Sequence, residues 1–263
     1  MTTKAEKQGV LRSDDDGVAT LTLNRPDIRN ALSYALMGEL TDAFKAVEAD
    51  PSVRVVVLAA TGPAFCAGHD LKEVRSDAKE EVYRALFERC ATLMKTIVRL
   101  KKPVIAKVHA MATAAGCQLV ASCDLAVASE TARFATPGVN IGLFCSTPMV
   151  ALSRSVGNKA AMEMLLTGIP SSAEDALRFG LVNRVVPPDA LDETVRGLAA
   201  VIASKSPLTL AIGKEAFYRQ KELTLDDAYE YASEVMVRNL LAHDAEEGID
   251  AFLAKRPPVW TGC

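Results

Sequence analysis

The chain has 263 residues, with 30 Lys and Arg against 33 Asp and Glu and a formal net charge of −3 at pH 7. A chain of this length buries one substantial core, with or without a helical appendage. Because the net charge is small and both signs are scattered, no basic field would attract nucleic acid or an anionic membrane. We therefore expect neither nucleic acid nor a membrane as a partner.

The cysteines indicate a reducing environment. They form no CxxC motif or paired framework and mostly stand among apolar residues, which is typical of packed, reduced thiols. Residues 1–17 lack the apolar segment of a signal peptide and are too acidic and poor in arginine for a transit peptide. No apolar run reaches about 18 residues. These features predict a cytoplasmic protein. The six cysteines are Cys66, Cys90, Cys117, Cys123, Cys145 and Cys263.

The first half of the chain predicts alternating strands and helices. Residues 18–23 alternate as a half-buried strand does, and residues 53–59 are apolar and β-branched, as in a strand covered on both faces. After Ser33, apolar residues recur on one helical face until Asp50 and Pro51. The further elements expected are a loop at 61–70, an amphipathic helix at 79–100, a strand opened by Pro103, a loop of small residues, and a strand at 125–128.

The last third of the chain predicts mainly helices. Ser171-Ser172-Ala173-Glu174 matches a capping box that opens a short helix ended by Gly180, and residues 182–186 predict a strand. Residues 208–255 predict two or three helices that fold back on the core or clasp a neighbouring subunit. We therefore expect a core over residues 1–205 and a helical region over residues 206–263.

The small-residue loop is the most constrained part of the sequence. It enters a candidate helix at residues 115–122, whose first N–H groups have no intrahelical partner. Together with the helix dipole, these donors favour an anion or a developing oxyanion. Small side chains at Ala114, Ala115 and Gly116 let a carbonyl oxygen come close. Close packing of helix on strand would explain the same residues, so this loop alone leaves both interpretations open.

A second loop repeats the pattern. Phe65-Cys66-Ala67-Gly68-His69-Asp70 is again a strand end, small residues and a helix start. Two such loops could supply one N–H group each to a single oxygen. Preorganised donors of this kind are typically worth about 3 kcal/mol each in transition-state stabilisation. The sequence therefore predicts an oxyanion hole between the two loops.

These loops resemble the signature loops of the enoyl-CoA hydratase/isomerase, or crotonase, superfamily. The resemblance is carried by TGPAFCAGHDLKE (61–73) and KPVIAKVHAMATAAGCQLVASCDLAVAS (102–129) and extends through RFATPGVNIGL, EMLLTGIPSSAEDALRFGLVNRVVP and EGIDAFLAKRPPVW. It implies an α/β fold, a crotonase-like spiral of ββα turns with a C-terminal helical oligomerisation region. It also implies homotrimers or dimers of trimers, and an acyl-CoA thioester as substrate. No tightly bound cofactor and no metal are expected.

The resemblance also implies where the thioester would bind. The oxyanion donors would be the backbone N–H groups of His69 and Ala115. For the charged residues on the implied coenzyme A path, a solvated surface position is the alternative, while Asp70 and Asp124 suit helix-cap or turn roles. The implied path runs along Arg25, Ile28, Ala67, Gly68, Asp70, Leu71 and Lys72, with Phe252 and Lys255 from this chain or a neighbouring subunit.

The sequence departs from the family pattern at two positions. Family hydratases use two glutamates to activate water and to protonate the enolate carbon, and here these positions are Gln118 and Gly138. A carboxamide orients water or a carbonyl but has no pKa near 7, and glycine offers only space. Each acid–base group contributes roughly 10²- to 10⁴-fold, so efficient hydration by this route is not expected. Isomerase routes through a carboxylate at Gly138 or near Ser146 are equally unsupported.

Other side chains remain as candidates beside the thioester. His69 offers a titratable imidazole, or only its backbone N–H with the ring turned outward. Cys145 could act as a nucleophile if its pKa were lowered and otherwise only packs, and Ser146 lies in the same pocket segment. His109 suits a structural hydrogen bond. The sequence therefore predicts an acyl-CoA enzyme that stabilises an enolate or oxyanion, such as a decarboxylase, thioesterase or slow hydratase; the alternative is a non-catalytic acyl-CoA binder.

Overall fold

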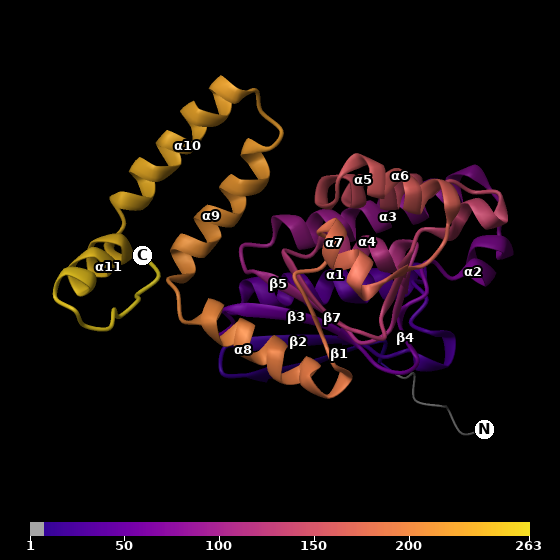
Figure 1. Cartoon of the computed structure of the whole chain (residues 1–263), viewed down its shortest axis with the longest axis horizontal. Coiled ribbons are helices and arrows are strands. Elements are labelled where there is room, and N and C mark those ends of the chain that lie inside the picture. The colour runs from indigo at the N-terminus through magenta and orange to yellow at the C-terminus, as the bar shows by residue number, and fades with distance from the viewer. Residues whose placement is uncertain (1–7) are drawn as a thin grey trace.

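The computed structural model describes residues 8–263, which form two sheets wrapped by helices (Figure 1). Each turn of the chain adds one strand to each sheet, so that the fold is the α/β spiral expected from the sequence. The six-stranded sheet has the order β1-β2-β3-β5-β7-β10 and the four-stranded sheet the order β4-β6-β8-β9. Three turns of the spiral each place one strand in the six-stranded sheet and the next strand in the four-stranded sheet. These strands are β3 (Val55–Ala60) then β4 (Ala64–Cys66), β5 (Val104–Val108) then β6 (Met111–Thr113), and β7 (Leu125–Ser129) then β8 (Arg133–Ala135).

Three of the remaining strands, β1, β9 and β10, lie at sheet edges. β1 (Val10–Asp15) pairs antiparallel with β2 (Val18–Leu23), and β10 (Arg184–Val186) pairs parallel with β7. β9 (Ser171–Ser172) pairs antiparallel with β8. The strands β3, β5 and β7 are parallel neighbours. Their buried, β-branched composition suits a sheet covered on both faces.

Helices cover both faces of the six-stranded sheet. On one side lie α1 (Tyr34–Ala49), α3 (Glu80–Arg99) and α4 (Ala115–Ser122), and on the other lies α8 (Leu191–Ala203) (Figure 1). Each side has its own buried apolar cluster. The predicted helical face of α1 is confirmed, because its apolar residues are fully buried: Leu36, Leu40, Phe44 and Val47.

The helix ends follow the predicted capping chemistry, with one shift. The Ser33 Oγ accepts a hydrogen bond from the Leu36 N–H at 3.2 Å and begins α1. Helix α7 (Ala173–Phe179) does begin with a capping box and end at a left-handed Gly180, but the box uses Ser172 and Asp175. The predicted pair, Ser171 and Glu174, was wrong by one residue, since it is the Ser172 Oγ that accepts from the Asp175 N–H at 3.0 Å.

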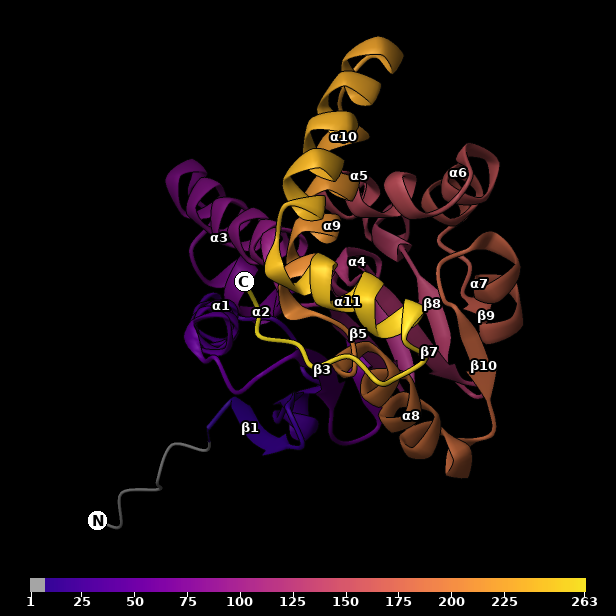
Figure 2. The ribbon, with the colours of Figure 1, turned by 90° about the vertical axis from the view of Figure 1, so that its left-hand side faces the viewer.

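Three helices form an arm that extends away from the sheets (Figures 1 and 2). They are α9 (Pro207–Gln220), α10 (Leu225–Leu240) and α11 (His243–Leu253). The Lys214 Nζ joins α9 to the core, because it pairs with the Asp124 carboxylate at 2.7 Å and donates to two backbone carbonyls. The Tyr218 hydroxyl donates to the same carboxylate at 2.9 Å. A domain boundary at residue 205 stays a prediction.

Some elements were not predicted, and the reason lies in tertiary pairing. The expected loop at 61–70 contains β4, which pairs with β6 through Cys66 and Ala112. A three-residue strand between Gly and Pro residues has no periodicity of its own to reveal it. The other helices are α2 (Leu71–Ser76), α5 (Ser146–Ser155) and α6 (Asn158–Thr167), and three 3₁₀ segments are η1 (Pro26–Ile28), η2 (Pro137–Ile141) and η3 (Pro188–Ala190).

The cysteines are free thiols, as the sequence predicts. Five are buried, and only Cys263 is exposed. Within residues 8–263 no single helix is long and apolar enough to span a membrane, although one sharply bent pair, Pro188–Ala203 with Pro207–Gln220, meets the length and composition test together.

Candidate functional site

The two predicted loops meet at the ends of β4 and β6. Gly68 has a φ of +87°, and a Cβ there would lie 3.0 Å from the Ala114 Cβ and 3.5 Å from the Ala115 nitrogen. A Cβ on Gly116 would collide with Cys66, 2.8 Å from its Cβ. The loops therefore touch only because their residues are small.

Hydrogen bonds orient the backbone of the first loop. The Gly68 carbonyl accepts from the Leu32 N–H at 2.7 Å, and the Asp70 N–H donates to the Leu32 carbonyl at 3.0 Å. In this parallel pairing the N–H of the intervening His69 faces away from Leu32 and donates to no acceptor among residues 8–263. The Asp70 carboxylate caps α2 by accepting from the Lys72 and Glu73 N–H groups, which confirms its predicted cap role.

The second loop presents a matching donor. Ala115 is the first residue of α4, and the first intrahelical bond of this helix comes from the Gln118 N–H to the Ala114 carbonyl. The Ala115 N–H donates to no acceptor in the described part of the chain, as expected at a helix start. Two free N–H groups on adjoining loops form the arrangement that binds a developing oxyanion.

Gln118 lies one turn into α4 and is 4 % exposed. Its Oε1 accepts from the Cys90 thiol on α3 at 3.7 Å. Burial raises the pKa of Cys90 to about 12, so the thiol keeps its proton and acts as the donor. Because Oε1 is occupied in this way, the Nε2 group remains to donate to a ligand. Gln118 therefore offers a hydrogen-bond donor and no base.

Gly138 differs from the expectation that glycine leaves space. A Cβ at this position would lie 2.6 Å from the Leu143 carbonyl oxygen and 2.9 Å from the Cys145 Sγ. The Gly138 N–H donates to that Sγ at 3.4 Å, and the Gly138 carbonyl accepts from the Leu143 N–H at 2.9 Å. The prediction of open space was wrong, because the following turn folds back onto residue 138.

Cys145 and Ser146 stand at the start of α5. Burial raises the pKa of Cys145, and the Gly138 N–H only partly opposes this shift. A protonated thiol at neutral pH is a weak nucleophile. The Ser146 hydroxyl donates to the Phe144 carbonyl at 3.4 Å and is exposed. Neither group is activated by an adjacent base in this geometry.

The two histidines near the loops differ in their partners. The His109 Nε2 lies 2.8 Å from the Gly62 carbonyl, which agrees with its predicted structural role. The His69 ring packs edge-on against Phe87 of α3, with 5.7 Å between centroids. Burial lowers the pKa of His69, and the nearby Leu32 carbonyl opposes the shift only in part. The ring is therefore neutral at pH 7.

The residues of the implied coenzyme A path fall into two groups. The first, which we call the loop group, comprises residues of the His69 loop and of the neighbouring segment 25–28. The Ala67 N–H donates to the Arg29 carbonyl and so joins the two segments, and the Arg25 guanidinium donates to the Ser33 hydroxyl. Phe252 belongs to α11 and Lys255 follows this helix, which lies on the opposite side of the chain from α2 (Figure 1). One chain does not bring the two groups together. The loop group is Arg25, Ile28, Ala67, Gly68, Asp70, Leu71 and Lys72.

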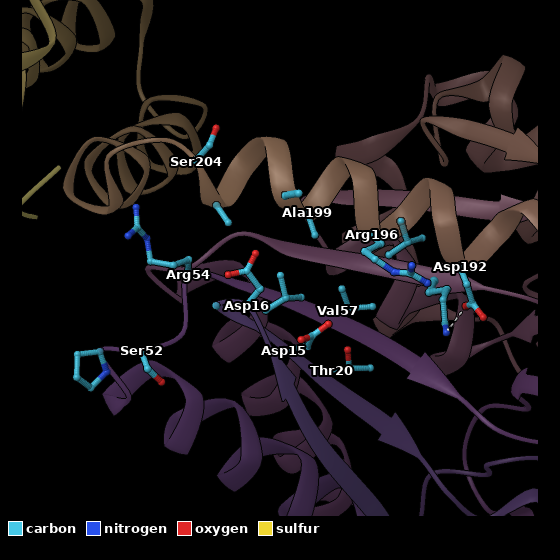
Figure 3. Close-up of a pocket in the computed structure, with 17 residues that line it drawn as sticks. Asp15, Asp16, Thr20, Ser52, Arg54, Val57, Asp192, Arg196, Ala199 and Ser204 are labelled. Atoms are coloured by element: carbon cyan, nitrogen blue, oxygen red, sulfur yellow. Dashed lines mark hydrogen bonds and ion pairs between the residues drawn. The ribbon is translucent and has the colours of Figure 1, made fainter. Parts of the chain in front are cut away.

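A groove of about 870 Å³ lies elsewhere, between α8 and the β1–β3 strands (Figure 3). Asp15, Asp16, Arg54 and Arg196 line it, and the Lys107–Asp192 ion pair of 2.6 Å crosses one end. It is on the α8 side of the six-stranded sheet and contains none of the predicted site residues.

Comparison with known proteins identifies the family. The family model for enoyl-CoA hydratase/isomerase matches residues 13–263, and the chain belongs to this family. It is 49 % identical to the enoyl-CoA hydratase domain-containing protein 3, mitochondrial, of Xenopus laevis over 94 % of this chain and 84 % of that protein. The resemblance of ATAAGCQLVASCD and ATPGVNIGLFCSTP to this branch of the family agrees with that similarity.

Solved structures agree with the fold. The enoyl-CoA hydratase of Mycobacterium smegmatis superposes with a TM-score of 0.94 at 55 % identity, covering 97 % of this chain and 99 % of that chain. The human enoyl-CoA hydratase domain-containing protein 3 superposes with a TM-score of 0.93 at 46 % identity, covering 96 % and 100 %.

The expected cytoplasmic location is contradicted by the comparison. The Xenopus laevis relative is named a mitochondrial protein, as are the rat and human relatives with the same name. The expectation depended on reduced thiols and on the composition of residues 1–17. Buried thiols report how the cysteines pack and do not distinguish the cytoplasm from another reducing compartment.

Proposed function

We propose that this chain is an acyl-CoA-processing enzyme that stabilises a thioester enolate or tetrahedral oxyanion with the backbone N–H groups of His69 and Ala115. The observation that carries the proposal is that both groups lack an acceptor within residues 8–263 and lie on loops in contact. The family name, enoyl-CoA hydratase/isomerase, supports a coenzyme A thioester as the substrate. No other cofactor is needed for this step.

The reaction proposed is not ordinary two-glutamate hydration. Gln118 supplies a donor where that reaction needs a base, and the space beside Gly138 is filled by Leu143 and Cys145. The thiol of Cys145 keeps its proton near neutral pH. Decarboxylation or hydrolysis of a thioester needs the oxyanion hole and makes smaller demands on these two positions. The site is therefore proposed for chemistry of that kind or for slow hydration.

We also propose that a second copy of the chain completes the coenzyme A path. The loop group borders the oxyanion hole, and Arg25 and Lys72 are its cationic members that would face the phosphates, while Asp70 caps α2. Phe252 is 82 % exposed and belongs to α11, which lies on the opposite side of the chain from α2 (Figure 1). A neighbouring subunit in a trimer, or in a dimer of trimers, would supply Phe252 and Lys255.

A non-catalytic acyl-CoA binder is the second candidate. It is favoured by the same two departures, Gln118 and Gly138, and by the raised pKa values of the buried thiols. The two candidates share the binding path and differ in turnover. A turnover assay therefore separates them.

The test compares two substitutions at one donor. Ala115→Pro removes the N–H at a helix position that accepts proline, whereas Ala115→Gly keeps it. Turnover is measured as crotonyl-CoA hydration, acetyl-CoA hydrolysis and malonyl-CoA decarboxylation, with thermal melts to check folding. We expect wild type and Ala115→Gly to turn over at least one substrate and Ala115→Pro to lose about 10²- to 10³-fold.

The other outcomes are equally informative. Binding of all three thioesters without turnover would favour the non-catalytic binder. Equal turnover by a folded Ala115→Pro variant would contradict the oxyanion hole. Hydration of crotonyl-CoA at ordinary enzyme rates would contradict the proposed loss of two-glutamate chemistry.

A further inference from the structure

The His69 side chain carries an unusual pair of unpaired atoms. Among residues 8–263, four side-chain nitrogen or oxygen atoms are buried without a hydrogen-bond partner, and two of them are Nδ1 and Nε2 of His69. A neutral imidazole has one donor and one acceptor. The Leu32 carbonyl is near enough to influence the pKa of the ring, but it accepts no hydrogen bond of normal geometry from either nitrogen. Buried polar groups are nearly always paired, so an exception of this kind points to a role with a ligand.

The other histidines of the chain do not share this property. The His109 ring lies at hydrogen-bond distance from the Gly62 carbonyl, and the His243 Nδ1 lies 3.3 Å from the Thr261 hydroxyl. Each therefore has a structural partner. His69 alone presents both ring nitrogens free.

Helix α3 fixes where the His69 ring lies relative to the oxyanion loops. The ring contacts Phe87, and Gln118 accepts from Cys90. Phe87 and Cys90 are three residues apart and so are neighbours on one face of α3. The imidazole and the Gln118 amide therefore both contact this face of α3. The His69 ring also belongs to the residue whose backbone N–H is one of the two unpaired donors of the loops.

We propose that the His69 imidazole is the proton-transfer group of this site. It removes a proton from the carbon next to the thioester carbonyl, so that the C–H electron pair forms the enolate and the proton resides on a ring nitrogen. The negative charge on the oxygen is held by the His69 and Ala115 N–H groups. Return of the proton restores the thioester, and no oxidant, reductant or further reactant is needed. This inference rests on the proposed oxyanion hole.

Two further features suit the ring to this role. The lowered pKa of His69 keeps it in the free-base form at neutral pH. The absence of a carboxylate at positions 118 and 138 leaves no competing base at the places where family hydratases have one. Of the two histidines beside these loops, His69 can therefore accept a proton without giving up a structural hydrogen bond, whereas the His109 ring is bound to the Gly62 carbonyl.

The experiment follows hydrogen–deuterium exchange at C2 of butyryl-CoA in D₂O by NMR. Butyryl-CoA has no double bond to hydrate, so exchange reports enolate formation alone. We expect wild type to exchange the C2 protons, and His69→Phe, which keeps the backbone donor and the contact with Phe87, to slow exchange by about 10²- to 10⁴-fold. His243→Gln removes a distant histidine and is the matched control.

Each result decides the inference. Butyryl-CoA binding with exchange that His69→Phe does not slow, or binding to wild type without exchange, would overturn it. No butyryl-CoA binding at all would contradict the proposed function itself. Should His69→Phe fail to fold, the wild-type pH profile still tests the inference. Exchange must then fall as acidification protonates the ring and stay constant at higher pH.

Discussion

Gln118 and Gly138 hold the two positions where family hydratases have glutamates, but the structure treats them differently. Gln118 has the shape of glutamate and a defined environment, with its Oε1 bound by the Cys90 thiol. Gly138 has no room even for a Cβ, since the Leu143 carbonyl would lie 2.6 Å away. The first position has lost a charge, and the second has lost the space for a side chain.

This difference predicts which change is reversible. Restoring a carboxylate at residue 118 needs no backbone movement. Restoring one at residue 138 requires the 138–145 turn to open, because backbone atoms rather than a flexible side chain fill the space. A double glutamate variant is therefore not a simple reconstruction of a two-glutamate hydratase.

The largest effect is expected for Gly138→Glu. The new side chain must displace the Leu143 carbonyl and the Cys145 thiol and also places a carboxylate in a buried turn. We expect the free energy of unfolding to fall by about 3 kcal/mol or more. Urea unfolding monitored by circular dichroism measures it. A variant as stable as wild type would show that the turn is freely movable.

Gln118→Glu is expected to fold and to gain activity. A carboxylate there can accept a proton, so crotonyl-CoA hydration should rise by about 10²-fold over wild type, the lower end for one acid–base group. Gln118→Met, which has similar volume and no donor or base, is the control. A rise in both variants would contradict the acid–base explanation.

The same variant has an expected pH dependence. Burial beside a thiol, without a cation, raises the pKa of a carboxyl group above its unfolded value. The folded protein then binds more protons than the unfolded chain, so Gln118→Glu should lose stability as pH rises. Wild type carries no such contribution from residue 118. Unfolding curves at several pH values measure the free energy of unfolding of Gln118→Glu and of wild type and compare their pH dependence.

A smaller effect tests what fills the space at residue 138. Gly138→Ala should cost about 1–3 kcal/mol by overpacking. Adding Cys145→Ala removes the thiol contact but leaves the Leu143 carbonyl in place. We therefore expect only partial rescue in the double variant. Full rescue relative to Cys145→Ala alone would show that the thiol, and not the backbone, restricts the position.

The sequence predicted the two loops because their chemistry is local, and it predicted the fold class because these loops resemble the signature loops of the family. Small residues between a strand and a helix indicate free N–H groups wherever they occur. In the structure the two loops that carry the donors are in contact, because Gly68 and Gly116 have no side chain to keep them apart. The capping box was predicted one residue early because Ser171 and Ser172 are each followed three residues later by an acidic residue, so the local pattern does not distinguish them.

The crowding at Gly138 and the contacts of His69 and Gln118 with α3 could not be predicted. Nothing in the sequence shows that residues 143 and 145 fold back on residue 138. The spacing of Phe87 and Cys90 indicates that they share a helix face, but it does not indicate that His69 and Gln118 lie against that face. The positions of His69 and Gln118 against α3 depend on contacts between elements that are distant in the chain.

The smallest expected effect concerns His69, the group that remains titratable where Gln118 and Gly138 have none. Its pKa is lowered by burial from an ordinary value of 6.5, so between the lowered value and 6.5 the unfolded chain binds more protons than the folded protein. Stability should therefore fall as pH decreases below about 6.5 and be constant with respect to this group above it.

His69→Phe removes this contribution, and the comparison with wild type isolates it from every other group. We expect the difference in unfolding free energy between the two proteins to change only in the acidic window below 6.5. A difference that does not vary with pH would mean that the folded ring titrates at its ordinary value. The ring would then be accessible to solvent or paired, and the unsatisfied nitrogens that distinguish His69 from Gln118 would have found a partner in the free protein.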